Sequence, residues 1–197
     1  MRRGLSGRLW LIVPLALAAV MSVRAQETAV TLDPEKSAVS FTLAASFHTV
    51  HGSFRVKSGA LRFNSASGAA GGLIVVDATS GETGNKKRDR NMHHDVLKSA
   101  TYTEVTFMLT HVTGKLQPQG ESKVQVDGTL KILGTEHPIT LPFDIQITGI
   151  DLHAATQFAI PYVQWGLKNP SNAFLHVADN VQMSIAAVGK ISPAEAH

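Results

Sequence analysis

The chain has 197 residues, of which 44% are hydrophobic and 17% are charged, and it contains no cysteine. The lack of cysteine excludes disulfide bonds, cysteine-ligated metal centres and a thiol nucleophile. Four of the 18 basic residues lie in residues 1–25, which leaves 14 basic against 15 acidic residues in the rest of the chain. A nearly neutral domain is not expected to attract nucleic acid.

Residues 1–25 have the three parts of a secretion signal. Three arginines precede the apolar run Leu9–Val20, and Val23 and Ala25 place small residues before the expected cleavage site. We therefore predict that residues 1–25 are removed and that the protein is periplasmic or secreted. The apolar run is shorter than the ~20 residues that a spanning helix needs, so no stable membrane span is expected after cleavage.

Residues 26–191 are predicted to form one domain and residues 192–197 a flexible tail. Apolar and polar side chains alternate along most of about nine segments, which is typical of β-strands because successive side chains leave opposite faces of a sheet. In chain order these segments cover 39–43, 54–56, 61–63, 73–76, 105–109, 124–132, 139–147, 158–160 and 181–187. Glycine-bearing turns separate them at short spacing, which indicates an antiparallel sandwich or barrel. Pro142 lacks an N–H, so its strand is predicted to be an edge or bulged there.

One segment departs from the strand pattern. Met92, Val96 and Leu97 recur at helical offsets, and Asn85 is a suitable N-cap. A single short helix is therefore predicted over Lys86–Ser99, between two strands. Its first turn is rich in basic residues, which would either bind a phosphate or form a solvated surface.

The alternation also identifies side chains that face the interior. This inward set is predicted to include Phe41, Leu43, Phe54, Phe107, Leu109, Phe143, Ile145 and Phe158. A barrel of roughly eight strands either fills with its own side chains or holds one small ligand. Periodicity does not separate these two alternatives. Trp165 would either line the mouth of a cavity or anchor a loop.

The evidence for catalysis in the sequence is thin. Asp89 and His93 lie four residues apart, which on a helix would let the carboxylate orient the imidazole as in half of a hydrolytic triad. The chain lacks the Gly-x-Ser-x-Gly element that would supply a nucleophile. His93, His94 and Asp95 are consecutive and do not share one helix face, so a metal site is not predicted. We expect no catalytic residues and no cofactor, with a hydrolase using Asp89 and His93 as an alternative.

Three groups of motifs follow one another along the domain. They are Asp33–Phe41 with His51–Phe54, then Thr83–Asn85, Arg88–Asp89, Val96–Ser99 and Tyr102–Phe107, and finally Val126–Thr135 with Pro138–Leu141. In this order and spacing, across roughly residues 30–191, they resemble the YceI-like family of bacterial polyisoprenoid-binding proteins. No single motif is specific, but the ordered set is.

The resemblance implies an all-β fold, namely an antiparallel eight-stranded lipocalin-like barrel with one short helix between strands. It also implies an apolar cavity and, as the ligand partner, an isoprenoid lipid such as a polyprenyl phosphate or a quinone tail. The expected apolar contacts are the inward set together with Trp165. The polar end of the ligand is expected near Lys86, Arg88, Asn91 and His93.

The chain departs from the residues that the family often carries at Asn91–Met92 and at Gln164–Gly166. Both departures lie where the polar end of the ligand is expected. Besides the hydrolase, a structural or interaction β-barrel module with a filled core is an alternative function, and a homodimer is possible.

Overall fold

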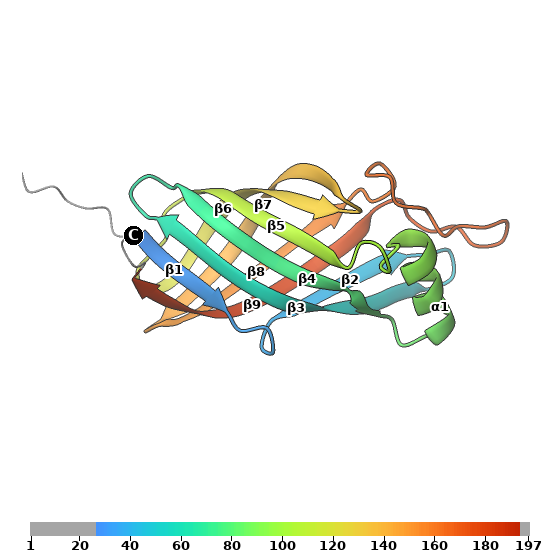
Figure 1. The fold of residues 1–197 in the computed structure, drawn as a ribbon, viewed down its shortest axis with the longest axis horizontal. Helices are drawn as coiled ribbons and strands as arrows, with labels where there is room; N and C mark the ends of the chain where they lie inside the picture. Colours follow the sequence, from blue (N-terminus) through green and yellow to red (C-terminus); the bar gives the residue numbers. More distant parts are fainter. Residues whose placement is uncertain (1–26, 194–197) are drawn as a thin grey trace, which may run out of the picture.

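The computed structural model describes residues 27–193. The expected signal peptide, residues 1–25, and the last four residues of the expected tail lie outside this range. Within it the chain forms nine β-strands and one short helical segment, drawn in Figure 1: β1 (Glu27–Leu32), β2 (Ala38–Ala44), β3 (Thr49–Asn64), β4 (Ala70–Glu82), α1 (Lys86–Asn91), η1 (Met92–Val96), β5 (Glu104–Thr113), β6 (Gly120–Ile132), β7 (Thr135–Thr148), β8 (Asp151–Ile160) and β9 (Val181–Pro193).

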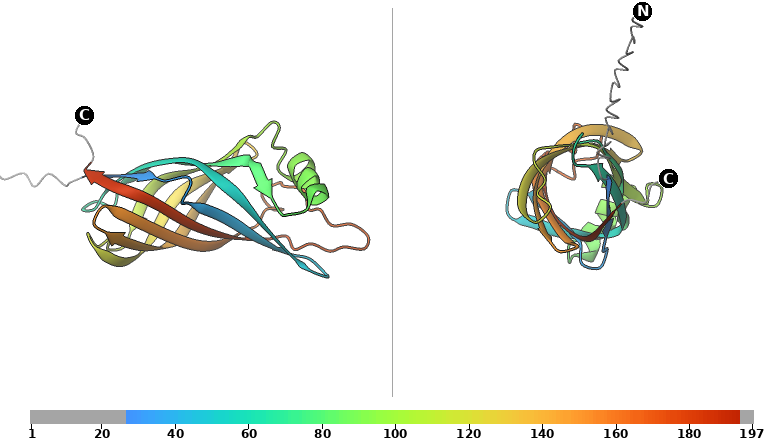
Figure 2. Two further views of the ribbon diagram at one scale, coloured as in Figure 1. Left: turned by 90° about the horizontal axis from the view of Figure 1, so that it is seen from below. Right: turned by 90° about the vertical axis from the view of Figure 1, so that its left-hand side faces the viewer.

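The strands close into one antiparallel barrel, seen end-on in Figure 2. β1 and β2 each pair with both β3 and β9, so they lie end to end in a single position of the barrel. The pairing of β3 with β4 closes the circle. The nine strands therefore occupy eight positions, and the predicted eight-stranded antiparallel barrel with one short helix is confirmed.

A short turn at Asp33–Ser37 separates β1 from β2 and is fixed to β9. The Ser37 hydroxyl donates to the Asp33 carbonyl oxygen at 2.7 Å and accepts from the Val188 N–H at 3.1 Å. The Asp33 N–H donates to the Val188 carbonyl oxygen at 2.7 Å. These bonds allow the chain to leave the wall of the barrel and rejoin it in the same position.

Two ends of the barrel are distinguished by their connections. The helix end carries segments 45–48, 83–103, 133–134 and 161–180, and the terminal end carries 65–69, 114–119 and 149–150. β1 begins and β9 finishes at the terminal end, opposite α1 (Figure 1). β9 extends to Pro193, so Ser192 and Pro193 of the expected tail pair with β1.

The alternation of side chains along the strands places every second residue inside the barrel. In β6 the buried residues Val124, Val126, Leu130 and Ile132 alternate with half-buried and exposed ones. At the terminal end a cluster of Val30, Leu32, Ile147, Leu152 and Ala187 fills the interior. A second cluster, toward the helix end, surrounds the upper part of the interior.

Two glycines make room for Leu32 within the terminal cluster. A Cβ on Gly59 of β3 would lie 2.4 Å from Leu32 Cδ1, and a Cβ on Gly189 of β9 would lie 3.1 Å from Leu32 Cδ2 and 2.7 Å from the Thr31 carbonyl oxygen. Glycine in a strand often marks such a close approach. The side chain of Leu32 thereby fills the barrel beneath the point where β1 ends.

The helical segment begins as the sequence predicts. The Asn85 side chain accepts from the N–H groups of Lys87 and Arg88, both at 3.1 Å. The second half is a wider turn, in which the Leu97 N–H donates to the Met92 carbonyl oxygen at 2.8 Å. The helix ends at Val96, three residues before the predicted boundary. None of the helical segments within residues 27–193 is long and apolar enough to cross a bilayer.

The position of Pro142 also agrees with the prediction. β7 pairs with β6 along its whole length, but it pairs with β8 only from Asp144 to Thr148. On its β8 side, β7 is therefore an edge at Pro142, which is the position in a sheet where proline is tolerated.

We expect Thr156→Val to stabilise the fold. Thr156 is 5% exposed, and its hydroxyl has no hydrogen-bond partner among the described residues. A buried unpaired hydroxyl costs free energy, and valine has nearly the same shape. Urea unfolding should show a gain of about 1 kcal/mol.

The matched control is Ser122→Ala. Ser122 is also buried, but its hydroxyl accepts from the Gln117 N–H at 2.8 Å. Its loss should lower the free energy of unfolding by about 1 kcal/mol. The same sign of change in both variants would contradict the assignment of Thr156 as unpaired.

Candidate ligand-binding cavity

A cavity of about 540 Å³ occupies the barrel interior at the helix end. Its size is within the ~300–1,000 Å³ usual for small-molecule sites. The terminal cluster lies beyond it, so the interior is filled at one end and hollow at the other. The alternative of a structural module requires a core that is filled along the whole barrel. The interior of this barrel is not filled at the helix end.

Aliphatic and aromatic side chains make most of the cavity wall. Seven strands contribute to it: Val39, Phe41 and Leu43 of β2, Val50 and Phe54 of β3, Val76 of β4, Val105 of β5, Leu130 and Ile132 of β6, Phe158 and Ile160 of β8, and Val181, Met183 and Ile185 of β9. The rings of Phe41 and Phe54 have their centroids 5.5 Å apart. An apolar wall of this kind suits a hydrocarbon ligand.

Phe41 depends on the glycine opposite it. Phe41 and Gly52 are cross-strand partners, and a Cβ on Gly52 would lie 2.3 Å from Phe41 Cζ. The ring therefore lies against the bare backbone of β3. This arrangement holds a large aromatic group flat against the wall.

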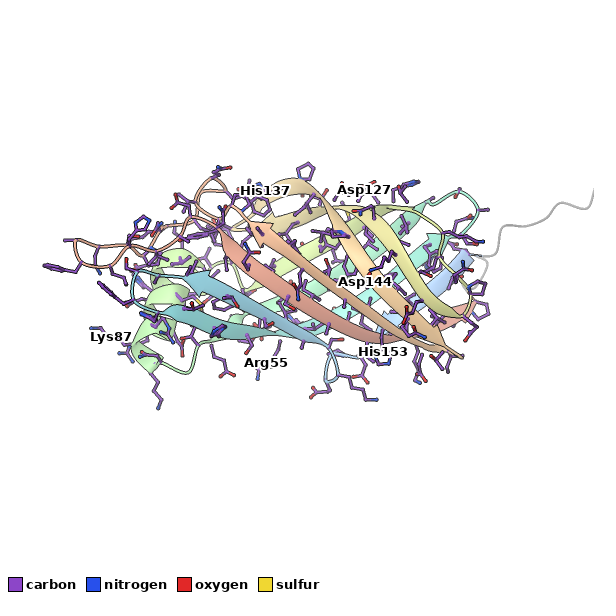
Figure 3. The ribbon with its side chains drawn as sticks, turned by 180° about the vertical axis from the view of Figure 1, so that it is seen from behind. Arg55, Lys87, Asp127, His137, Asp144 and His153 are labelled. Carbon is purple, nitrogen blue, oxygen red and sulfur yellow. The ribbon has the colours of Figure 1, made fainter. Side chains whose placement is uncertain are left out.

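Polar side chains gather where the helix meets the cavity. Thr83, Asn85, Lys87, Arg88 and Asn91 all contribute to the lining. Figure 3 shows Lys87 on α1 at this end, whereas Asp144 and His153 are exposed toward the terminal end. The cavity is thus apolar along its strands and polar on its α1 side.

Arg88 is held in place by Thr83, which lies three residues before α1. Its Nε donates to Thr83 Oγ1 at 2.7 Å, and its Nη2 donates to the Thr83 carbonyl oxygen at 2.9 Å. Asp89 accepts from the Thr83 N–H at 2.9 Å. These bonds use part of the donor capacity of the guanidinium and orient the group at the edge of the cavity.

The predicted apolar site residues fall into three groups. Phe41, Leu43, Phe54 and Phe158 line the cavity. Phe107, Leu109, Phe143 and Ile145 belong to the surrounding core and are not on the lining. Trp165 packs against this core and stacks on His137, with ring centroids 4.1 Å apart and planes 5° apart. Of the two roles considered for Trp165, this contact corresponds to the anchoring of a loop.

The predicted polar residues divide as well. Arg88 and Asn91 line the cavity, while Lys86 and His93 do not. His93 Nε2 lies 2.8 Å from the Gly81 carbonyl oxygen, and Nδ1 lies 2.9 Å from Ser99 Oγ. A carbonyl oxygen only accepts, so Nε2 donates and a neutral ring accepts from Ser99 through Nδ1. His93 therefore braces the helix against β4.

Asp89 and His93 do not form the hydrogen bond that the hydrolase alternative would need. Both ring nitrogens of His93 have other partners, and the Asp89 carboxylate accepts from Thr83. A general base requires a free nitrogen within reach of a substrate proton. Residues 27–193 also contain no group of three or more His, Asp or Glu side chains that could hold a metal ion.

Sequence patterns missed the part of the lining that comes from segment 161–180. Tyr162, Leu167, Leu175 and Val177 lie on the cavity wall, yet the segment has no strand or helix periodicity. It follows β8 and contacts β7 through the stacking of Trp165 on His137. The apolar face of the helical segment was a usable signal, because Met92, placed at a helical offset, lines the cavity.

Tyr162 is the most perturbed ionisable group of the site. Burial, and to a lesser extent the charge of Asp179, raises the pKa of Tyr162 to about 12. Its hydroxyl donates to the Ala178 carbonyl oxygen at 2.8 Å. The phenol is therefore neutral under ordinary conditions and joins the two ends of the loop.

Alkaline pH should destabilise the fold through Tyr162. Its pKa rises from the ordinary 10.0 to about 12 in the folded protein. Between these values the unfolded phenol has lost its proton while the folded one retains it, so stability falls as pH rises from about 10 to about 12. Urea unfolding across this range should show a weaker pH dependence in Tyr162→Phe than in the parent. Equal slopes would contradict the assignment, because the lysines titrate in both proteins.

Together, fold and cavity define a small antiparallel barrel with an apolar interior site at one end. The family model for the YceI-like domain matches residues 30–188, and the chain belongs to this family. The family resemblance found in the sequence is thereby confirmed.

Known proteins with similar sequences or folds agree with this assignment. UPF0312 proteins of Vibrio parahaemolyticus and Vibrio campbellii are each 28% identical over 142 residues, which is 70% of this chain and 73% of theirs. A polyisoprenoid binding domain from Saccharophagus degradans, implicated in plant cell wall breakdown, has a similar fold, with a TM-score of 0.67, 19% identity, and coverage of 83% of this chain and 98% of that one. BcnA of Burkholderia cenocepacia gives a TM-score of 0.65 and 22% identity, over 80% of this chain and 98% of its own.

Proposed function

We propose that the protein binds a polyisoprenoid chain non-covalently in the cavity at the helix end of the barrel. The observation that carries the proposal is the apolar cavity of about 540 Å³, most of whose polar lining residues lie on or just before α1. The similar domain from Saccharophagus degradans is described as polyisoprenoid binding, which supports the same class of ligand here.

The hydrocarbon chain supplies the affinity in this proposal. Burial of apolar surface contributes about 25 cal/mol per Å². A branched, flexible prenyl chain matches a wall of phenylalanine and β-branched side chains, such as Phe158, Val39 and Ile185. The terminal cluster sets the depth to which the chain enters.

The polar end of the ligand lies beside α1 in this proposal. Lys87 and Arg88 bring two positive charges to the lining, and Asn91 adds an amide. Both charges favour an anionic head group such as the phosphate of a polyprenyl phosphate over a neutral quinone. Lys86 and His93 are given no contact with the ligand, because they lie off the lining.

We further propose that the protein acts in the periplasm or outside the cell. The pattern of arginines, an apolar run and small residues in residues 1–25 supports export.

The direct experiment is organic extraction of gently purified protein followed by mass spectrometry. An isoprenoid lipid present in stoichiometric amount is the expected result. Folded protein that carries no lipid and binds no added prenyl chain would defeat the proposal.

A chain-length series provides a further prediction. Each added isoprene unit should strengthen binding by about tenfold while it enters the cavity, and further units should add little once the cavity is full. Titration calorimetry with prenyl phosphates of increasing length would show this plateau. Affinity that does not depend on chain length would contradict binding through the hydrocarbon.

Adjacent positions on β9 allow a matched pair of variants. Val181 lines the cavity, whereas Gln182 is exposed on the outer face. Val181→Trp should fill part of the cavity and weaken binding by about tenfold or more, whereas Gln182→Trp should bind as the parent does. Equal affinities in the two variants would place the ligand elsewhere.

A further inference from the structure

Two phenylalanines at the helix end are almost fully exposed. Phe47 is 82% exposed and Phe174 is 89% exposed, the largest values among the large hydrophobic side chains of the described residues. Such exposure has no benefit for folding, because neither ring contributes to the core. Both residues lie in connections, Phe47 between β2 and β3 and Phe174 in segment 161–180.

The two connections are joined to each other. The Ala178 N–H donates to the Ala44 carbonyl oxygen at 2.9 Å, and the Ser46 N–H donates to the His176 carbonyl oxygen at 2.9 Å. The His176 N–H donates in turn to Ser46 Oγ at 3.1 Å. The phenylalanines therefore project from one hydrogen-bonded pair of loops, which extends beyond the barrel in Figure 2.

This pair of loops forms part of the cavity mouth. Ala45 is next but one to Phe47, Leu175 follows Phe174, and both Ala45 and Leu175 line the cavity. The exposed rings thus lie within two residues, along the chain, of side chains that line the cavity. A ligand that passes the mouth at this side passes beside them.

The connections at the same end of the barrel carry a net positive charge. Segment 83–103 carries the basic residues Lys86, Lys87, Arg88, Arg90 and Lys98 against the acidic residues Asp89 and Asp95. In segment 161–180 one lysine and one aspartate cancel, and segments 45–48 and 133–134 carry neither Lys, Arg, Asp nor Glu. The connections at the helix end therefore have a net charge of +3, although residues 26–197 as a whole have a net charge of −1.

We propose that the helix end docks on the surface of a membrane that contains anionic lipids, with Phe47 and Phe174 inserted among the acyl chains. Peripheral binding of this kind needs two signals, an apolar group that enters the bilayer and basic residues that contact the head groups. The docked orientation brings the cavity mouth to the lipid, so that a prenyl chain moves between bilayer and barrel without crossing water. The inference rests on the proposed function for its ligand.

A bilayer fits these features better than a protein partner does. Specific protein interfaces bury about 800 Å² on each side around a packed apolar centre. Here the apolar groups are two exposed rings at the same end of the barrel as the basic residues of segment 83–103. These features suit a fluid, anionic surface.

The experiment is co-sedimentation of the protein with vesicles of phosphatidylcholine alone and of phosphatidylcholine mixed with phosphatidylglycerol. The parent should bind the mixed vesicles more strongly, and high salt should weaken this binding. The double variant Phe47→Ser with Phe174→Ser should lower the partition coefficient by about tenfold or more. Ile150→Ser is the matched control, because Ile150 is 59% exposed at the terminal end.

A second pair of variants tests the charges. Lys86 and Arg90 are exposed and lie off the cavity lining, so Lys86→Glu with Arg90→Glu should remove the preference for phosphatidylglycerol. Arg62→Glu with Lys115→Glu is the control of equal charge toward the terminal end and should retain it.

The outcomes separate this proposal from the proposed function. Binding of a short, soluble prenyl phosphate without vesicles tests the cavity alone, and the phenylalanine variant should bind it as the parent does. Equal vesicle binding by the parent and both helix-end variants would overturn membrane docking while leaving the cavity assignment intact. Loss of self-association in the phenylalanine variant, with vesicle binding unchanged, would overturn it in favour of an interface with a second copy of the chain.

Discussion

The side chain of Leu32 is the contact on which the division of the barrel depends. It fills the interior at the point where β1 ends, because Gly59 and Gly189 leave the space that a Cβ would occupy. Below it the terminal cluster is solid, and above it the residues of β2 border the cavity. A barrel of eight positions has room for either a core or a small ligand. Here the turn between β1 and β2 marks the change from one to the other.

Strand periodicity predicted the barrel well, because burial on one face of a sheet is a local property of each strand. The inward orientation of Phe41, Phe107 and Phe143 follows directly from alternation. Alternation does not tell which of the inward residues line the cavity, because this depends on segments that are distant in the chain. β7 and β8 stop pairing at Asp144, and Tyr162 and Leu167 of the segment after β8 pack in the core, while Trp165 stacks on His137 of β7. The sequence of segment 161–180 has no periodic pattern that would predict this contact.

Prediction from the sequence also had a limit for the polar residues of the site. Asn85 was predictable as an N-cap, since capping needs only neighbouring N–H groups. The placement of Lys87 on the lining, with Lys86 off it, depends on how the helix rotates against the barrel. His93 was expected beside the ligand, but its partners Gly81 and Ser99 are fixed by β4 and by the turn after the helix. A histidine whose two ring nitrogens bond a backbone carbonyl oxygen and a serine hydroxyl has a structural role, whatever its spacing from an aspartate.

The unpaired stretch between β7 and β8 gives the barrel unequal walls. Along residues 135–143, β7 pairs with β6 on one side and has no ladder with β8 on the other. Packed side chains rearrange at lower cost than a hydrogen-bonded ladder separates. On this side the wall of the hollow half is therefore more easily deformed than the paired wall of the solid half.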